Sequence, residues 1–148
     1  MTTTDNRTTA EDLIRNVIDD WARAIRARDL DKMTSNYAPN VLSFDVVEPL
    51  QSVGVGAIRE RAEEWISSFV GPIGYEIRDL SVTAGDDVAF CHSLNRVSAT
   101  RVGGHKLDMW WRATVCFQKR GGQWLATHQH NSVPFDVQSG KASLDIRP

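Results

Sequence analysis

The chain has 148 residues, of which 41% are hydrophobic and 24% are charged, and its formal net charge is −2. This composition is typical of a single soluble globular domain that buries enough core to fold without a metal or a disulfide. The lack of a basic surplus argues against nucleic-acid binding, and no apolar run is long enough to span a membrane. The polar start, residues 1–10, lacks the apolar core of a signal peptide, so we expect a cytoplasmic protein.

Helical spacing dominates the first part of the chain. Apolar residues recur every three or four positions over 10–28, with Thr9 as the expected N-cap. Asp29 is placed to cap a short second helix, which we expect to reach about Tyr37 and to be stopped by Pro39.

A short strand over 41–46 and a third helix are expected next. Gly54 and Gly56 precede this helix, and Gly71-Pro72 ends it. Its apolar stripe consists of Ile58, Ala62, Trp65, Ile66 and Phe69. This spacing favours a helix that turns one face toward the core.

The hydrophobic period changes to two from Ile73 onward, which indicates strands. Long segments rich in Val, Phe, Trp and Thr follow over 88–100, 105–119 and 123–133, separated by glycine-marked turns. Sequential strands with short turns form an antiparallel meander. Helices first and strands later predict an α+β fold. We expect a cone-shaped α+β barrel, in which the helices pack on a strongly curved antiparallel sheet around an internal pocket.

Nothing in the sequence divides the chain into separate units. We therefore expect one domain over 1–148, with a flexible N-terminus at 1–9 and a C-terminal tail at 135–148. Whether this tail folds along its own domain or onto a partner is left open. Cys91 and Cys116 form no CxxC motif, and we expect both to be reduced, buried thiols.

Four short motifs follow one another at characteristic spacing. They are Arg28-Asp29-Leu30-Asp31, Tyr37-Ala38-Pro39-Asn40-Val41 leading to Phe44-Asp45, Gly54-Val55-Gly56-Ala57-Ile58-Arg59, and Gly122-Gln123-Trp124 followed by His128-Gln129-His130-Asn131-Ser132. Over about 10–134 the chain resembles the nuclear transport factor 2-like superfamily, in particular its SnoaL-like and ketosteroid isomerase-like branch. The last motif is also similar to the association domain of calcium/calmodulin-dependent kinases. The resemblance implies the cone-shaped fold but no particular reaction, because this fold carries many functions.

Asp45 is the first candidate catalytic residue. The resemblance places it where ketosteroid isomerases have their general base. A carboxylate at the mouth of an apolar pocket is poorly solvated, which raises its proton affinity and suits it to abstract a proton next to a carbonyl. The alternative is a loop aspartate that caps a turn. Trp21 and Ala113 stand where that enzyme has its two oxyanion donors, so steroid isomerase activity is not expected.

His92 is the second candidate catalytic residue. Aligned on the isomerase pattern, its position faces the pocket, where a neutral imidazole could polarise a carbonyl or relay a proton. The alternative is a buried histidine that hydrogen-bonds a neighbouring strand.

His128 and His130 lie two positions apart and share one face of a strand. Two such histidines could ligate a metal, but no further ligands can be placed, so we expect no metal and no organic cofactor. The resemblance instead implies that Gln129 and Asn131 face the pocket. A single β-bulge would reverse the faces, so Arg112 and His130 are second-choice pocket residues.

Tryptophans are concentrated where a ligand would bind. We expect Trp21, Trp65 and Trp111 to line the pocket, although core packing alone would also explain them. Trp110 and Trp111 are adjacent on a strand, so they must point to opposite faces. A tryptophan on the outer face would be an unusual apolar patch, which predicts a homodimer through the sheet.

Two functions follow. The first is a cofactor-free acid–base enzyme, of isomerase, cyclase or dehydratase type, that acts on a small apolar carbonyl compound. The second is a non-catalytic, dimeric ligand-binding or association domain of the same fold. The position of Asp45 distinguishes them, since the enzyme needs this carboxylate within reach of a bound ligand.

Overall fold

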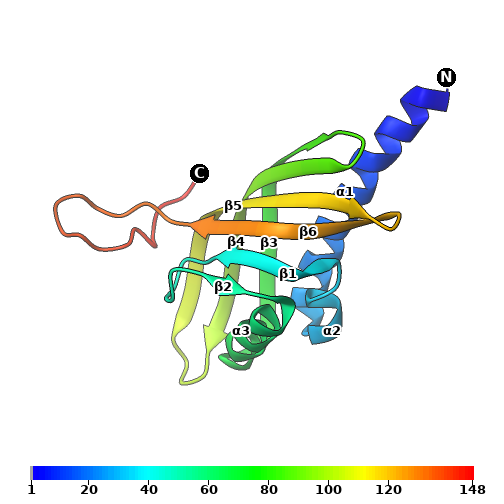
Figure 1. Ribbon diagram of the computed structural model, residues 1–148. Helices are drawn as coiled ribbons and strands as arrows, with labels where there is room; N and C mark the ends of the chain where they lie inside the picture. The colour runs from blue at the N-terminus through cyan, green and yellow to red at the C-terminus, as the bar shows by residue number, and fades with distance from the viewer. Residues whose placement is uncertain (1) are drawn as a thin grey trace.

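The computed structural model describes the backbone of residues 2–148 and the side chains from residue 10 onward (Figure 1). In chain order the elements are α1 (Thr2–Ala27), α2 (Leu30–Met33), β1 (Tyr37–Phe44), β2 (Ser52–Val53), α3 (Val55–Ser67), β3 (Phe69–Ala84), β4 (Val88–Arg101), β5 (Lys106–Arg120) and β6 (Gln123–Ser132). The predicted α+β class, with helices before a long-stranded meander, is confirmed.

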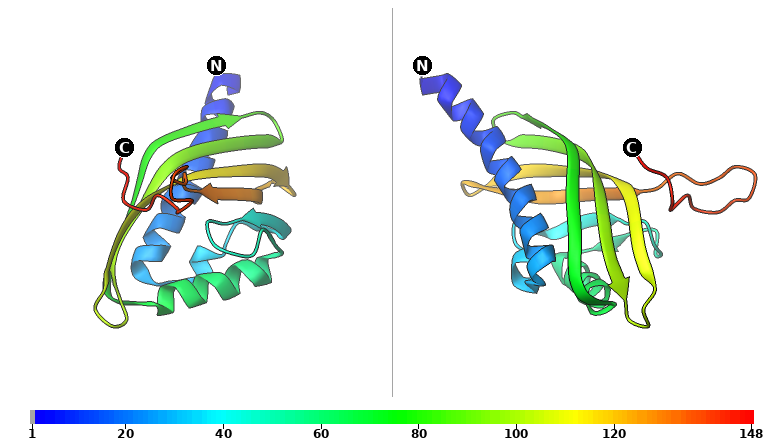
Figure 2. Two further views of the ribbon diagram at one scale, coloured as in Figure 1. Left: turned by 90° about the vertical axis from the view of Figure 1, so that its left-hand side faces the viewer. Right: turned by 180° about the vertical axis from the view of Figure 1, so that it is seen from behind.

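The strands form a single curved sheet that curls around α1 and α3 (Figure 2). Its order is β2-β1-β6-β5-β4-β3, and the meander from β3 to β6 is antiparallel as predicted. The sheet as a whole is mixed, because β1 pairs in parallel with β6. The expectation of a purely antiparallel sheet is therefore wrong for this pair. The long connection from β1 through α3 and the meander permits the parallel pairing. Among the described residues β2 and β3 form the two edges, so the sheet stays open.

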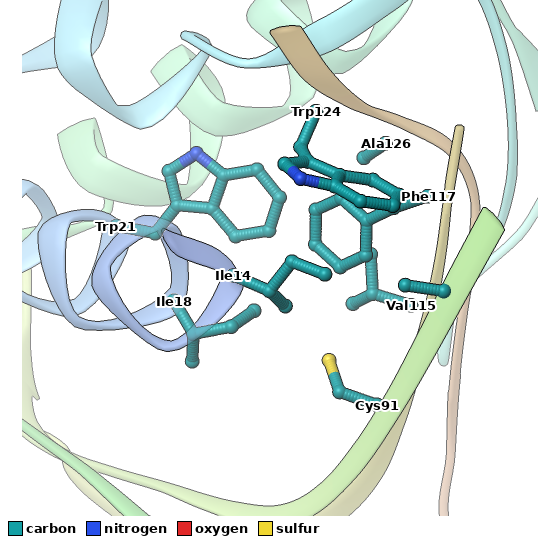
Figure 3. Close-up of a cluster of buried hydrophobic side chains, with 9 residues drawn as sticks. Ile14, Ile18, Trp21, Cys91, Val115, Phe117, Trp124 and Ala126 are labelled. Atoms are coloured by element: carbon teal, nitrogen blue, oxygen red, sulfur yellow. The ribbon is translucent and has the colours of Figure 1, made fainter. Parts of the chain in front are cut away.

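One hydrophobic cluster joins α1 to the concave face of the sheet (Figure 3). The predicted helical stripe supplies Ile14, Ile18 and Trp21, which pack against buried side chains of β4, β5 and β6. The Trp21 ring stacks on Phe117 with the centroids 6.2 Å apart, and its indole nitrogen donates to the Ser35 carbonyl at 2.9 Å. This cluster fixes the helix across one half of the sheet.

Helix boundaries differ from the sequence prediction at three points. The first helix begins at Thr2, ahead of the expected N-cap at Thr9. Asp29 does cap α2, accepting from the Lys32 backbone at 3.2 Å, but this helix ends at Met33 and not near Tyr37. The third helix ends at Ser67.

Both prolines that were expected to stop helices lie inside strands. Pro39 falls in the break of β1–β6 register between Tyr37 and Leu42, and Pro72 falls in a break of β3–β4 register. Proline is tolerated at such irregularities because no ladder hydrogen bond is lost there.

The C-terminal tail pairs mainly with itself. An isolated bridge joins Phe135 to Ala142, so the segment projects beyond β6 as a hairpin (Figure 1). Near the end of the chain Arg147 pairs with Asp108 at 3.2 Å, and Asp108 also pairs with Arg96. Among the described helices, none has the length and apolar character that crossing a membrane requires.

Candidate functional site

The concave face of the sheet is covered unevenly. Beneath α1 the inward-facing residues Val115, Phe117 and Trp124 are buried. Toward α3, a second cluster buries Phe69, Ile73 and Val97, and the inward-facing Met109 and Trp111 that pack against it are only partly buried. Solvent therefore reaches the α3 end of the concave face, and this is where a ligand could contact inward-facing side chains.

A β-bulge in β6 decides which side chains face this open half. Phe117 pairs with Ala126 and Cys116 with His128, so Thr127 is an extra residue in β6. Even-numbered residues face inward before the bulge and odd-numbered ones after it. Gln129 and Asn131 consequently share the concave face with their pairing partners Val115 and Ala113.

Tyr37 connects β1 to β6 through a chain of polar side chains. Its hydroxyl donates to Gln129 Oε1 at 2.8 Å, and Gln129 Nε2 donates to Ser43 Oγ at 3.1 Å. The Trp21 ring stacks on the Tyr37 ring with the centroids 4.7 Å apart. The Tyr37 proton is thus already engaged within the protein.

Tyr75 stands at the end of a second polar chain. Ser93 Oγ donates to Asn95 Oδ1 at 2.7 Å, and Asn95 Nδ2 donates to the Tyr75 hydroxyl oxygen at 3.0 Å. Trp65 and Trp111 approach the Tyr75 ring edge-on, with centroids 6.5 and 5.7 Å away. No acceptor for the Tyr75 proton is found in the part of the chain whose side chains are described, so this hydroxyl can donate to a ligand.

Both tyrosines are held neutral. Burial raises the pKa of Tyr37 far above its ordinary value, and the negative charge of Asp45 raises it further. Burial likewise raises the pKa of Tyr75, and the hydrogen bond from Asn95 lowers it in part.

Asp45 lies at the rim of this region, directly after β1. Its Oδ1 accepts from the Val46 backbone at 2.7 Å, and its Oδ2 is 3.7 Å from Nε of Arg61 on α3. Arg61 Nη2 donates to the Glu48 carbonyl at 2.9 Å. The carboxylate is one-third exposed, so it is accessible to a ligand while both of its oxygens face protein donors.

Four of the predicted site residues lie on or against the concave face: Trp65, Trp111, Gln129 and Asn131. Their role in binding a ligand stays a prediction. Trp21 also points inward, but its ring belongs to the buried core and its N–H is taken by Ser35. Trp21 therefore supports Tyr37 from behind, and its indole N–H is not free to bind a ligand.

The orientation predicted for His92 is wrong. Its neighbours Cys91 and Ala89 are buried against α1, so alternation places His92 on the convex face, where it is exposed. It cannot polarise a group bound on the opposite face. The inward-facing polar residues of this strand are Ser93 and Asn95, two and four positions after Cys91.

The second-choice residues Arg112 and His130 are both exposed on the convex face. His128 uses its Nδ1 to contact the Leu42 carbonyl at 2.8 Å. Within the described residues, no three His, Cys, Asp or Glu side chains come together as metal ligands would. The expectation of no metal and no organic cofactor stays a prediction.

Tyr37, Tyr75 and Asn95 are the site residues that the sequence analysis missed. The alternation of side chains along β4 could have indicated Asn95, because it lies on the same side of the strand as the apolar residues Cys91 and Val97. A cavity of about 320 Å³ lies between α1 and β3, and one of about 330 Å³ lies at the β3–β4 turn. Neither cavity is lined by Tyr37, Tyr75 or Asn95. The internal pocket therefore also stays a prediction.

Comparison with known proteins establishes the family. A family model described as a SnoaL-like domain matches residues 14–136. The chain belongs to this family. A solved NTF2-like protein of unknown function from Pseudomonas putida KT2440 is 35% identical, with a TM-score of 0.86 over 95% of this chain and 98% of that one. No curated protein matches the chain.

More distant structures share the fold of this SnoaL-like domain. A ketosteroid isomerase-like protein from Erwinia carotovora atroseptica is 18% identical, with a TM-score of 0.70 over 82% of this chain and 94% of that one. An uncharacterized protein with a cystatin-like fold from Caulobacter vibrioides is 16% identical, with a TM-score of 0.71 over 86% and 91%. At these identities the likeness concerns the fold alone.

Proposed function

We propose that this SnoaL-like protein binds a small, mostly apolar carbonyl compound at the open half of its concave face and transfers protons on it without a metal or organic cofactor. The observation that carries the proposal is the Tyr75 hydroxyl. It is neutral, it is oriented by Asn95, and its proton is free of protein acceptors among the described side chains. Trp65 and Trp111 supply the apolar surroundings.

The chemistry follows from the two ends of the site. The Tyr75 hydroxyl donates to the carbonyl oxygen of the ligand and stabilises the negative charge that develops there. Asp45 takes the proton from the adjacent carbon, so that the C–H bond breaks and its electron pair forms the enolate. Return of the proton to another carbon gives an isomerase, whereas loss of a leaving group gives a lyase.

A non-catalytic binding domain is the second candidate. It is favoured by the contacts of Asp45, since an ion pair with Arg61 and a hydrogen bond from Val46 would also suit a carboxylate that only closes a turn. In that case the Tyr75 hydroxyl orients a ligand and no bond is broken.

Binding of cyclic ketones tests the site. We expect a panel of such ketones to quench the fluorescence of Trp65 and Trp111, and Tyr75→Phe to weaken their affinity about 2- to 10-fold, as for loss of one neutral hydrogen bond. Tyr37→Phe is the comparison: its proton is already used by Gln129 and does not reach the ligand, so the loss of affinity should be smaller than for Tyr75→Phe. The site is disproved if no ketone binds, or if both variants bind like the wild type.

We also propose a homodimer through the convex face. Trp110 lies on this face, but it is buried beneath Arg96 of the same chain. It therefore leaves no apolar patch for a partner subunit to cover. Val88 and Phe90 instead expose apolar surface beside the apolar cavity at the β3–β4 turn. We expect sedimentation to give twice the chain mass of 16.6 kDa at micromolar concentration, and Phe90→Asp to give monomers. A monomeric wild type would contradict the proposal.

The cysteines support the proposed cytoplasmic location. Both are free, and burial raises the pKa of Cys91 to about 11, which keeps this thiol protonated and unreactive. Free thiols are typical of a reducing compartment.

A further inference from the structure

We infer that the C-terminal loop, residues 135–142, is a binding arm, and that Val137 at its tip inserts into the apolar cavity at the β3–β4 turn of a second copy of the chain. This inference rests on the homodimer proposed above and is independent of the chemistry proposed for the concave face. Each copy has one loop and one cavity, so a two-fold axis satisfies both contacts at once and closes the assembly.

The C-terminal loop is ordered by its own hydrogen bonds. The Asp136 carboxylate accepts from the backbone N–H groups of Gln138 at 3.4 Å and Ser139 at 3.2 Å. The Asp136 carbonyl accepts from the Gly140 N–H at 2.7 Å, and the Asp136 N–H donates to the Lys141 carbonyl at 2.7 Å, which closes the loop at its base. Because the loop is already ordered, it loses less conformational entropy when it binds a partner.

The loop presents an apolar side chain that its own chain leaves uncovered. Val137 lies at the tip and is 84% exposed. A branched aliphatic side chain in an ordered tip gains free energy when another surface removes it from water. Beyond the loop, Arg147 pairs with Asp108 at 3.2 Å, and Asp108 lies two positions before Trp110, on the same convex side of β5. The tail is therefore attached on the side of the sheet where the homodimer is proposed.

The cavity at the β3–β4 turn suits this tip in size and in charge. Its volume is about 330 Å³, and none of the residues that line it carries a charge. Cys91 and Phe117 are buried against α1. Alternation therefore places their neighbours Phe90 and Cys116, which pair across β4 and β5, on the convex face of the sheet. An uncharged apolar hollow favours an aliphatic side chain over a charged one, which would be buried there without a partner.

The loop and the cavity lie at opposite ends of the sheet, so they do not meet within one copy (Figure 1). The loop follows the end of β6 at Ser132, whereas the cavity adjoins the β3–β4 turn and reaches Thr127 in the first half of β6. Two copies that pack their convex faces about a two-fold axis perpendicular to the strands have strands running in opposite directions. The end of β6 in one copy then lies over the start of β6 in the other, which brings each loop to the partner's cavity.

Cross-linking tests the contact directly, because the free Cys116 lines the cavity. We expect Val137→Cys to form a covalent dimer on mild oxidation or with a short bismaleimide, and mass spectrometry to find position 137 of one copy joined to Cys116 of the other. Cys116→Ser in the same background should remove the cross-link. Val102→Cys is the matched control, because Val102 is also exposed, at 65%, but lies in the β4–β5 turn, and it should form no link to Cys116.

Sedimentation measures the contribution of the loop to the dimer. Val137→Asp should weaken dimerisation about 10- to 100-fold, because the carboxylate would enter an uncharged apolar cavity without a partner. Val102→Asp should leave dimerisation unchanged. Both valines are exposed outside the core, so both variants should keep the far-UV circular dichroism of the wild type.

The outcomes separate this contact from the homodimer itself. If the wild type sediments as a monomer, the homodimer and the contact both fail. If the wild type is a dimer but neither reagent joins position 137 to Cys116, or Val137→Asp dimerises as tightly as the wild type, the homodimer stands and the contact is refuted. A link between position 137 and Cys116 within a single chain also refutes it, since the loop would then reach its own cavity.

Discussion

Asp45→Asn is expected to lower turnover of the ketone substrate by about two to four orders of magnitude, which is the usual effect of removing a general base. The amide is nearly isosteric with the carboxylate and can still accept from the Val46 N–H, so the loop after β1 should keep its conformation. It cannot take a proton from carbon at neutral pH. Initial rates on the best ketone of the binding panel, with the affinity for that same ketone measured in parallel, give kcat and binding separately.

Asp31→Asn is the matched control for this prediction. Asp31 also pairs with an arginine of α3, at 2.8 Å from Arg59, but on the exposed surface outside the concave face. This variant should keep full turnover, because an exposed ion pair contributes little. If Asp45→Asn retains turnover, or if ketones bind without being turned over by the wild type, the non-catalytic candidate replaces the enzyme.

The elements that follow from local periodicity could be predicted from the sequence. The apolar stripe of α1 and the alternation in β3 to β6 reflect the geometry of a helix and a strand, and neither depends on distant parts of the chain. The helix ends predicted from Pro39 and Pro72 are wrong because the positions of these prolines depend on distant strands. Each lies at a break in pairing register, and such a break is set by the partner strand.

The candidate site was harder to predict because it depends on which face each strand turns inward. The sequence prediction turned the wrong face of β4 inward and so placed His92 in the interior. In the structure its neighbour Cys91 is the buried residue. The alternation alone could not decide the faces of β6, since the extra residue Thr127 shifts them in mid-strand. Contacts between distant segments, such as Arg61 with Asp45, leave no local signal at all.

Substitution of a core residue should lower the free energy of unfolding, and Phe117 is the clearest case. It is 1% exposed and lies at the centre of the cluster between α1 and the sheet (Figure 3), where Trp21 stacks on it. Phe117→Ala should lower the free energy of unfolding by about 3–5 kcal/mol, because it removes buried apolar area and leaves a cavity that its rigid neighbours cannot fill. Urea titrations at one fixed protein concentration measure the change and keep any effect of dimerisation constant.

Phe135→Ala provides the comparison for the same side chain in the opposite environment. Phe135 is 65% exposed in the projecting tail, so its removal should change the free energy of unfolding by less than about 0.5 kcal/mol. A small effect of Phe117→Ala would mean that α1 is not held on the sheet by this cluster. Tyr37 would then lack the support of the Trp21 ring that stacks on it, and the hydrogen bond from Tyr37 to Gln129 would not be held in place. The stability of the core and the geometry of the candidate site therefore depend on the same contact between Trp21 and the sheet.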